Sequence, residues 1–190
     1  MVDQKKVKMG KKSKAAGGVF ELRVRHNLEE KGWFVDKFTD NVELIKEDAT
    51  LNPELSKSKG IVKKEFDGGQ WVKKMTYGKL IPAKTAFGFN PRLKMRVPLT
   101  RSTGFPDFIC FKKAYKPIGE STNKVYEIIG VESKMTGNLD RPEKEKCVWL
   151  LENNIFSKIL IAEKTKVKNR VVIVYHDFKE KYWRFYGSKD

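Results

Sequence analysis

An acidic and a basic side chain lie two positions apart at the end of an apolar run. The run Val125–Lys134 (VYEIIGVESK) is rich in the residues that favour strands, and Glu132 and Lys134 close it. Because side chains alternate between the faces of a strand, these two share one face, with Cα atoms roughly 6.5 to 7 Å apart. A carboxylate and an ammonium at that spacing could serve one reacting centre. The alternative is a surface salt bridge, which does not explain why the pair ends so apolar a strand.

Asp107 follows a proline at the start of another apolar run, DFICF. Pro106 bars the residue before it from a helical conformation, so we expect the chain to enter this run extended. A link rich in Pro, Gly, Ser and Asn separates the two runs and suits a hairpin, which would bring Asp107 beside Glu132. Two carboxylates so placed repel each other unless a cation lies between them, and a hard divalent metal supplies it. By itself, Pro-Asp is more often an ordinary turn.

A helix and a strand are expected before this hairpin. From about residue 15 to 31, apolar residues recur at every fourth position, namely Phe20, Val24 and Leu28. Gly32 supplies a stop, and residues 33–38 read as a strand. At about 100° per residue, Glu21 falls at the edge of the apolar stripe, where it can reach the seam between helix and sheet.

After the hairpin, the pattern predicts a helix and two more strands. The helix spans about 142–153, and Asp140 with Glu143 three residues later resembles a capping box. Strands follow at 158–163 and 171–175. The element order predicts an α/β fold in which helices pack on a mixed central sheet.

Two segments stand apart from this pattern. Residues 1–14 are rich in lysine and poor in apolar side chains, so we expect a flexible basic arm before a single domain at 15–190. Between about 39 and 103, lysines, glycines and prolines interrupt short apolar runs, which indicates a large basic insertion. We expect part of the insertion to form a hairpin, from about 75–81 and 93–98.

Charge points to a polyanionic partner. The chain carries 40 Lys and Arg against 24 Asp and Glu, a net charge of +16, which makes nucleic acid the leading candidate. A generally basic, solvated surface is the alternative to a nucleic-acid partner.

Cys110 and Cys147 lie in apolar runs without zinc-ligand spacing, so we expect both to be reduced residues that pack in the core. No apolar run has the length of a membrane span or a secretory signal, so we expect a cytoplasmic protein.

The combination of Pro106-Asp107, 24 intervening residues and Glu132-Ser133-Lys134 resembles the signature of the PD-(D/E)XK nuclease superfamily. The element order resembles that family's α-β-β-β-α-β core, which implies a restriction-endonuclease-like fold. The closest likeness is to archaeal Holliday junction resolvases, whose early helix carries a glutamate after small residues, here Gly17 to Glu21. The likeness covers roughly 15–38 and 104–175. Where the family often has glutamine or a basic residue early in the second helix, this chain offers Lys144 or Lys146.

The resemblance implies a Mg²⁺-dependent deoxyribonuclease that hydrolyses phosphodiester bonds. It implies that Asp107, Glu132 and the backbone carbonyl of Ser133 hold Mg²⁺ or Mn²⁺, and that Glu21 binds a metal-coordinated water or a second ion. Lys134 would orient or help deprotonate the attacking water and offset charge in the transition state. Cleavage of a four-way junction would require two active sites and hence a homodimer.

We expect DNA contacts from basic residues in the arm, the insertion and the second helix. They are Lys11, Lys12, Lys14, Lys63, Lys64, Lys73, Lys74, Arg92, Lys94, Arg96, Arg101, Lys144 and Lys146. Two alternatives stay open: a catalytically inactive nucleic-acid-binding protein of the same fold, and a basic protein associated with RNA or the ribosome. Metal-dependent cleavage of DNA would distinguish the nuclease from both alternatives.

Overall fold

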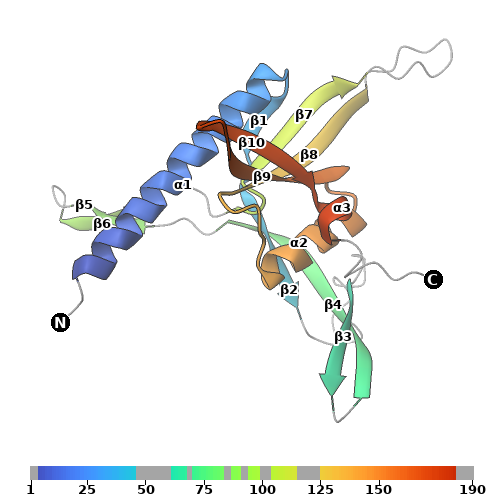
Figure 1. Cartoon of the computed structure of the whole chain (residues 1–190). Helices are drawn as coiled ribbons and strands as arrows, with labels where there is room; N and C mark the ends of the chain where they lie inside the picture. The colour runs from blue at the N-terminus through green and yellow to red at the C-terminus, as the bar shows by residue number, and fades with distance from the viewer. Residues whose placement is uncertain are drawn as a thin grey trace.

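The structure is a computed structural model that describes residues 4–45, 61–67, 70–83, 87–90, 94–98, 104–114 and 125–182. Its centre is a five-stranded sheet in the order β1-β7-β8-β9-β10, flanked by helices (Figure 1). The strands are β1 (Phe34–Lys37), β7 (Phe108–Ala114), β8 (Val125–Lys134), β9 (Lys158–Val167) and β10 (Arg170–Asp177). Only β8 and β9 pair in parallel within this sheet, so the mixed α/β architecture is confirmed.

Each face of the sheet carries its own apolar core. On one face, helix α1 (Gln4–Glu30) packs through the predicted stripe on residues of four strands, namely Val35, Phe108, Cys110, Ile129, Val131 and Ala162. On the other face, helix α2 (Arg141–Glu152) packs with Phe105, Phe156, Ile159 and Ile161, and with the short helix α3 (Phe178–Tyr182). Cys147 lies in this second core, and both cysteines are free and buried as predicted.

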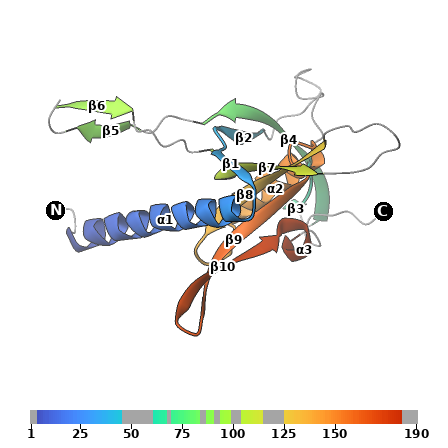
Figure 2. The ribbon, with the colours of Figure 1, turned by 90° about the horizontal axis from the view of Figure 1, so that it is seen from above.

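Helix α1 ends where the sequence predicts and begins earlier. At its end, Gly32 has a φ of 79°, its N–H donates to Glu29 O, and the Trp33 N–H donates to Leu28 O. These two bonds form a Schellman cap that needs glycine's freedom at positive φ. The helix begins at Gln4, so residues 4–14 belong to it and the predicted helix start at about residue 15 is wrong (Figure 2). Lysine is a good helix former, and extending an existing helix costs less than starting one.

The insertion forms two small sheets. The first has the order β2-β4-β3, from β2 (Asp40–Ile45), β4 (Gln70–Pro82) and β3 (Ile61–Asp67), and the second pairs β5 (Phe87–Asn90) with β6 (Met95–Pro98). The expected pairing of 75–81 with 93–98 is therefore wrong. Asp67 pairs with Gln70, and the two residues between them in the sequence are glycines, a dipeptide that favours a two-residue hairpin loop.

The predicted hairpin around the carboxylates is present. Strands β7 and β8 pair antiparallel from Phe108 opposite Val131 to Ala114 opposite Val125. The link that was expected between them, residues 115–124, lies outside the described residues. Among the helices of the described chain, none is both long and apolar enough to cross a membrane.

Candidate active site

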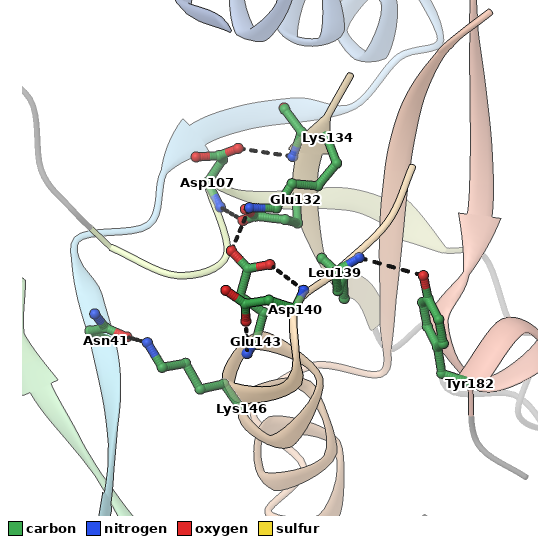
Figure 3. A network of polar contacts seen from close by, with 10 residues as sticks. Asn41, Asp107, Glu132, Lys134, Leu139, Asp140, Glu143, Lys146 and Tyr182 are labelled. Atoms are coloured by element: carbon green, nitrogen blue, oxygen red, sulfur yellow. Dashed lines mark hydrogen bonds and ion pairs between the residues drawn. The ribbon is translucent and has the colours of Figure 1, made fainter. Parts of the chain in front are cut away.

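The start of β7 and the end of β8 bring the two predicted carboxylates together. The Asp107 N–H donates to Glu132 Oε2 at 3.0 Å, and the Ser133 N–H donates to Asp107 Oδ2 at 2.9 Å (Figure 3). Each carboxylate thus accepts a backbone hydrogen bond from the segment that carries the other. The predicted meeting of Asp107 and Glu132 is confirmed.

Close packing fixes the segment that leads into Asp107. A Cβ on Gly130 would lie 2.8 Å from Pro106 Cγ, and one on Gly104 would lie 1.9 Å from the carbonyl oxygen of Phe38. Both positions therefore require glycine. In addition, the Phe105 N–H donates to Asp40 O at 2.9 Å and Pro106 is fully buried. The backbone before Asp107 is thus held from two sides, which leaves its carboxylate a narrow range of positions.

Glu132 is buried and Asp107 is half-buried, and the pKa values of both carboxyl groups are raised. Glu132 is 5% exposed, and burial, followed by repulsion from Asp107, raises its pKa to about 8 despite the nearby Lys134. Burial also raises the pKa of Asp107, with Glu21 adding to the rise and the Ser133 N–H, Lys37 and Lys134 opposing it. The pair therefore favours a shared proton or a bound cation over two bare negative charges.

The Lys134 ammonium lies between two carboxylates. Its Nζ is 3.2 Å from Glu132 Oε1 and also binds Glu143 Oε1, which comes from the first turn of α2. Burial alone would lower the pKa of Lys134, but the two carboxylates outweigh it and raise the pKa above its usual value. Lys134 therefore stays protonated at neutral pH in this arrangement.

Glu143 is a site residue that the sequence predicted only as part of a helix cap. The predicted capping box is present: the Glu143 N–H donates to Asp140 Oδ1 at 2.8 Å, and Glu143 Oε2 accepts the Asp140 N–H at 3.0 Å. Its other oxygen binds Lys134, so one carboxylate both caps α2 and holds the ammonium. The capping pattern was a visible signal, but sequence spacing alone did not show that the helix begins beside Lys134.

Glu21 lies at the helix–sheet seam, as predicted, but outside the carboxylate hydrogen bonds. Its Oε2 is 2.6 Å from the Nζ of Lys37 in β1, and that ammonium lies 4.4 Å from the centroid of the Phe108 ring. Glu21 is still close enough to raise the pKa of Asp107. The pair Glu21–Lys37 is thus an outer, partly exposed layer of the site, and sequence spacing gave no signal for Lys37.

The two candidate lysines of α2 point to different surroundings. Lys146 donates to Asn41 Oδ1 at 2.9 Å and lies 5.4 Å from the ring centroid of Phe105, two residues before Asp107 (Figure 3). Lys144 lies 4.5 Å from the ring centroid of Tyr182 in α3. Lys146 is therefore the one beside the segment that carries Asp107.

The structure places most, but not all, of the remaining basic residues that were predicted to contact DNA. Lys14 and Lys94 are exposed. Strand register places Lys63 opposite Lys74 and Lys64 opposite Lys73 in the β3–β4 pair. Lys11 and Lys12 belong to α1 and Arg96 to β6, whereas Arg92 and Arg101 lie outside the described residues.

The oxygen ligands that Asp107 and Glu132 offer suit a hard divalent cation, although they are only two side chains. Within the described residues, no group of three or more His, Cys, Asp and Glu side chains is arranged to hold a metal ion. Mg²⁺, however, is commonly bound by one or two carboxylates together with waters and substrate phosphates. Asp107 and Glu132 offer two such carboxylates, and a cation would relieve the repulsion that raises their pKa values. The Ser133 hydroxyl is also buried without a hydrogen-bond partner in the described chain.

Comparisons of the chain with known protein families, with curated protein sequences and with solved structures find no match. The function of the site must therefore be inferred from its residues, their geometry and their charge.

Proposed function

We propose that this protein is a Mg²⁺-dependent DNA endonuclease with a restriction-endonuclease-like core. One observation carries the proposal: the buried Glu132 carboxylate and the half-buried Asp107, both with raised pKa values, are joined through the Asp107 N–H, beside a lysine, at one end of the sheet in a protein of net charge +16. A protein that only bound a polyanion would gain nothing from two carboxylates placed together. Their desolvation has a purpose if they hold a cation against a phosphate.

Asp107 and Glu132 would be the side-chain ligands, joined by the backbone carbonyl of Ser133. The bound ion would supply Lewis-acid activation of the phosphate and a more acidic bound water. The backbone bonds that each carboxylate accepts keep it in place before the ion arrives. Glu21, with Lys37, would tune the charge at the outer side of Asp107.

Lys134 would act as a fixed positive charge. Because its pKa is raised, it is poorly suited to take a proton and well suited to offset negative charge on the transition state and to orient water. Glu143 is a second carboxylate bound to the ammonium besides Glu132, and it would keep the lysine in position during hydrolysis of the phosphodiester.

The β3–β4 hairpin and the amino-terminal half of α1 would bind the DNA backbone. Two pairs of lysines at directly opposed positions disfavour strand pairing through like-charge repulsion, and phosphate groups would relieve it. These contacts would supply affinity without reading sequence. A preference for branched DNA, with two active sites in a homodimer, follows from the resemblance to junction resolvases and not from the site itself.

A nucleic-acid-binding protein of the same fold without activity is the second candidate. The observation that favours it is that two carboxylates already neutralise Lys134, while no cluster of three ligands exists in the described chain. In that reading the ion pairs only stabilise the end of the sheet.

The two candidates separate in one experiment. The protein is incubated with a four-way junction, a flap, a single strand and a linear duplex of matched sequence, in Mg²⁺ and in EDTA. The endonuclease reading requires cleavage that depends on Mg²⁺ and yields nicked or cut strands. Binding to these DNAs in both buffers, with no cleavage in either, would refute it and support the second candidate.

A further inference from the structure

A row of apolar side chains crosses three strands of the central sheet and faces solvent. Register places Phe34 of β1 opposite Phe111 of β7, and Phe111 opposite Ile128 of β8. Residues opposed in this way lie on the same face of a sheet, and Tyr126 joins them two positions before Ile128. Phe34 is 64% exposed, Tyr126 51%, Ile128 41% and Phe111 37%. We call these four residues the aromatic row.

The row lies on the α2 face, past the part of that face that α2 covers. Ile109, two positions before Phe111, packs against the α2 core. Strand β9 begins to pair with β8 at Ile129, and the Ser157 hydroxyl and N–H close that end by bonding to Ile128 O. Beyond this point β7 and β8 run outward from the body of the molecule (Figure 1). Tyr126 is six residues from Glu132, roughly 20 Å along the strand.

The two phenyl rings form a stack with an open end. Their centroids are 5.2 Å apart and their planes differ by 10°, so one face of Phe34 is covered by Phe111. Strand β1 is an edge of the sheet, so no neighbouring strand of the described chain covers the other face of the Phe34 ring. A flat aromatic ring could therefore extend this stack outward.

Charge beside the row favours a polyanion over another protein surface. Lys113 is exposed and lies opposite Tyr126 in the β7–β8 register, hence on the same face as the row. Asp36, two positions after Phe34, is the exposed acidic residue of β1 on this face. The whole chain carries a net charge of +16, which opposes association of two copies and favours a polyanion. Flat aromatic faces next to a cation are the combination that binds unpaired bases on a phosphate backbone.

We propose that the aromatic row is a stacking platform for the unpaired bases of single-stranded DNA. Bases stack on the open face of Phe34 and on Tyr126, while Lys113 lies beside the phosphates. The surface is separate from the carboxylates, so the proposal does not depend on cleavage. In a nuclease it would hold an unpaired segment of the substrate roughly 20 Å from the carboxylates.

The test measures binding in EDTA, where a metal-dependent cleavage cannot occur. A single-stranded oligonucleotide with a 2-aminopurine base and a duplex of the same length are titrated with the protein, by fluorescence intensity and by anisotropy. Phe34→Ala and Tyr126→Ala should each weaken single-strand binding about tenfold, as expected for the loss of one stacked base, and reduce 2-aminopurine quenching. Duplex binding should stay within about twofold of wild type, since it depends on phosphate contacts.

Conservative variants distinguish stacking from apolar docking. Phe34→Trp should retain single-strand binding, whereas Phe34→Leu should weaken it about tenfold, as Phe34→Ala does, because leucine is apolar without a flat π face. Val167→Ala, at a position 51% exposed near the end of β9, is the matched control and should behave as wild type. Unchanged single-strand affinity in Phe34→Ala would overturn the proposal. So would retention of binding by Phe34→Leu, or a change of Phe34→Ala from dimer to monomer in sedimentation without loss of single-strand binding.

Discussion

Burying a carboxyl group beside a second one costs free energy unless a proton or a cation joins them. Glu132 is in that position: burial and Asp107 raise its pKa from 4.5 to about 8. In the metal-free protein, this group favours the folded state fully below its unfolded pKa. As pH rises through the folded value, that stability is lost, because the unfolded chain releases the proton first. Asp107, whose pKa is also raised, acts in the same direction.

We therefore expect the melting temperature of the metal-free protein to fall between about pH 5 and pH 8 through this pair. Glu132→Gln should flatten this part of the pH dependence, measured by circular dichroism in EDTA. Glu127→Gln, an exposed position on the same strand, is the matched control and should retain the wild-type slope. Mg²⁺ should raise the melting temperature more at pH 8 than at pH 5. An equal shift at both pH values would mean that the ion binds elsewhere.

Removing either carboxylate should abolish cleavage and spare DNA binding. Asp107→Ala and Glu132→Ala each delete a proposed ligand of the ion, but neither deletes a phosphate-binding cation, and lower repulsion could only strengthen affinity for a polyanion. Cleavage is measured in Mg²⁺ and binding by anisotropy in EDTA, with Glu127→Ala as the control. Near-normal cleavage by either variant would contradict the proposed site.

Glu143 is expected to position Lys134 rather than merely cap a helix, and two variants separate these roles. Glu143→Gln keeps an oxygen for the Asp140 N–H but removes the charge that binds Lys134, whose pKa should then fall. The turnover number should drop, and the alkaline limb of its pH profile should move to lower pH. Asp140→Ala removes the cap at a cost of about 1 kcal/mol but leaves Lys134 its partner. It should lower the melting temperature with an unchanged pH profile, and identical profiles for all three proteins would refute the positioning role.

At the scale of elements, the sequence predicted the features that depend on neighbouring residues, but it did not predict which distant segments pair. The helix stop at Gly32, the capping box at Asp140 and the hairpin that joins Asp107 to Glu132 each rest on residues close in sequence, and each is present. The partner of β4 was not predictable in this way. Its far half pairs with β2, from Asp40 opposite Pro82, and that choice depends on contacts between distant segments. Likewise Glu143 reaches Lys134 only because α2 begins beside β8.

The amino-terminal part of α1 is rich in lysine. Among the side chains of α1 that the structure describes, Phe20 is the first in the core, whereas Lys14, Ala15 and Ala16 are exposed. Exposed lysines on this part of the helix are candidates for phosphate contacts.

Deleting residues 1–14 should therefore make the salt dependence of DNA binding shallower. Each phosphate contact adds about 0.9 to the slope of log affinity against log salt on duplex DNA, so the loss of several contacts is measurable. Cleavage by the truncated protein at low salt and saturating DNA should continue, because every proposed catalytic residue lies beyond Lys14. An unchanged salt slope would show that this segment does not touch DNA, and loss of cleavage at saturation would show that it helps to build the site.

At the scale of the whole molecule, the sheet separates two cores, and each core contains one cysteine. Cys110 lies in the core under α1 and Cys147 in the core under α2, and both are fully buried. Burial raises the pKa of Cys110 to about 12 and that of Cys147 well above its usual value. Neither thiol is reactive while its core is closed.

The alkylation rate of each thiol therefore reports how often its own core opens. In the Cys110→Ala variant, the alkylation rate of Cys147 measures opening of the core under α2. In the Cys147→Ala variant, the alkylation rate of Cys110 measures opening of the core under α1. Because Glu143 links α2 to Lys134 and Glu132, Mg²⁺ should slow the alkylation of Cys147 more than that of Cys110. Equal rates, slowed equally by Mg²⁺, would mean that both layers open in a single cooperative step.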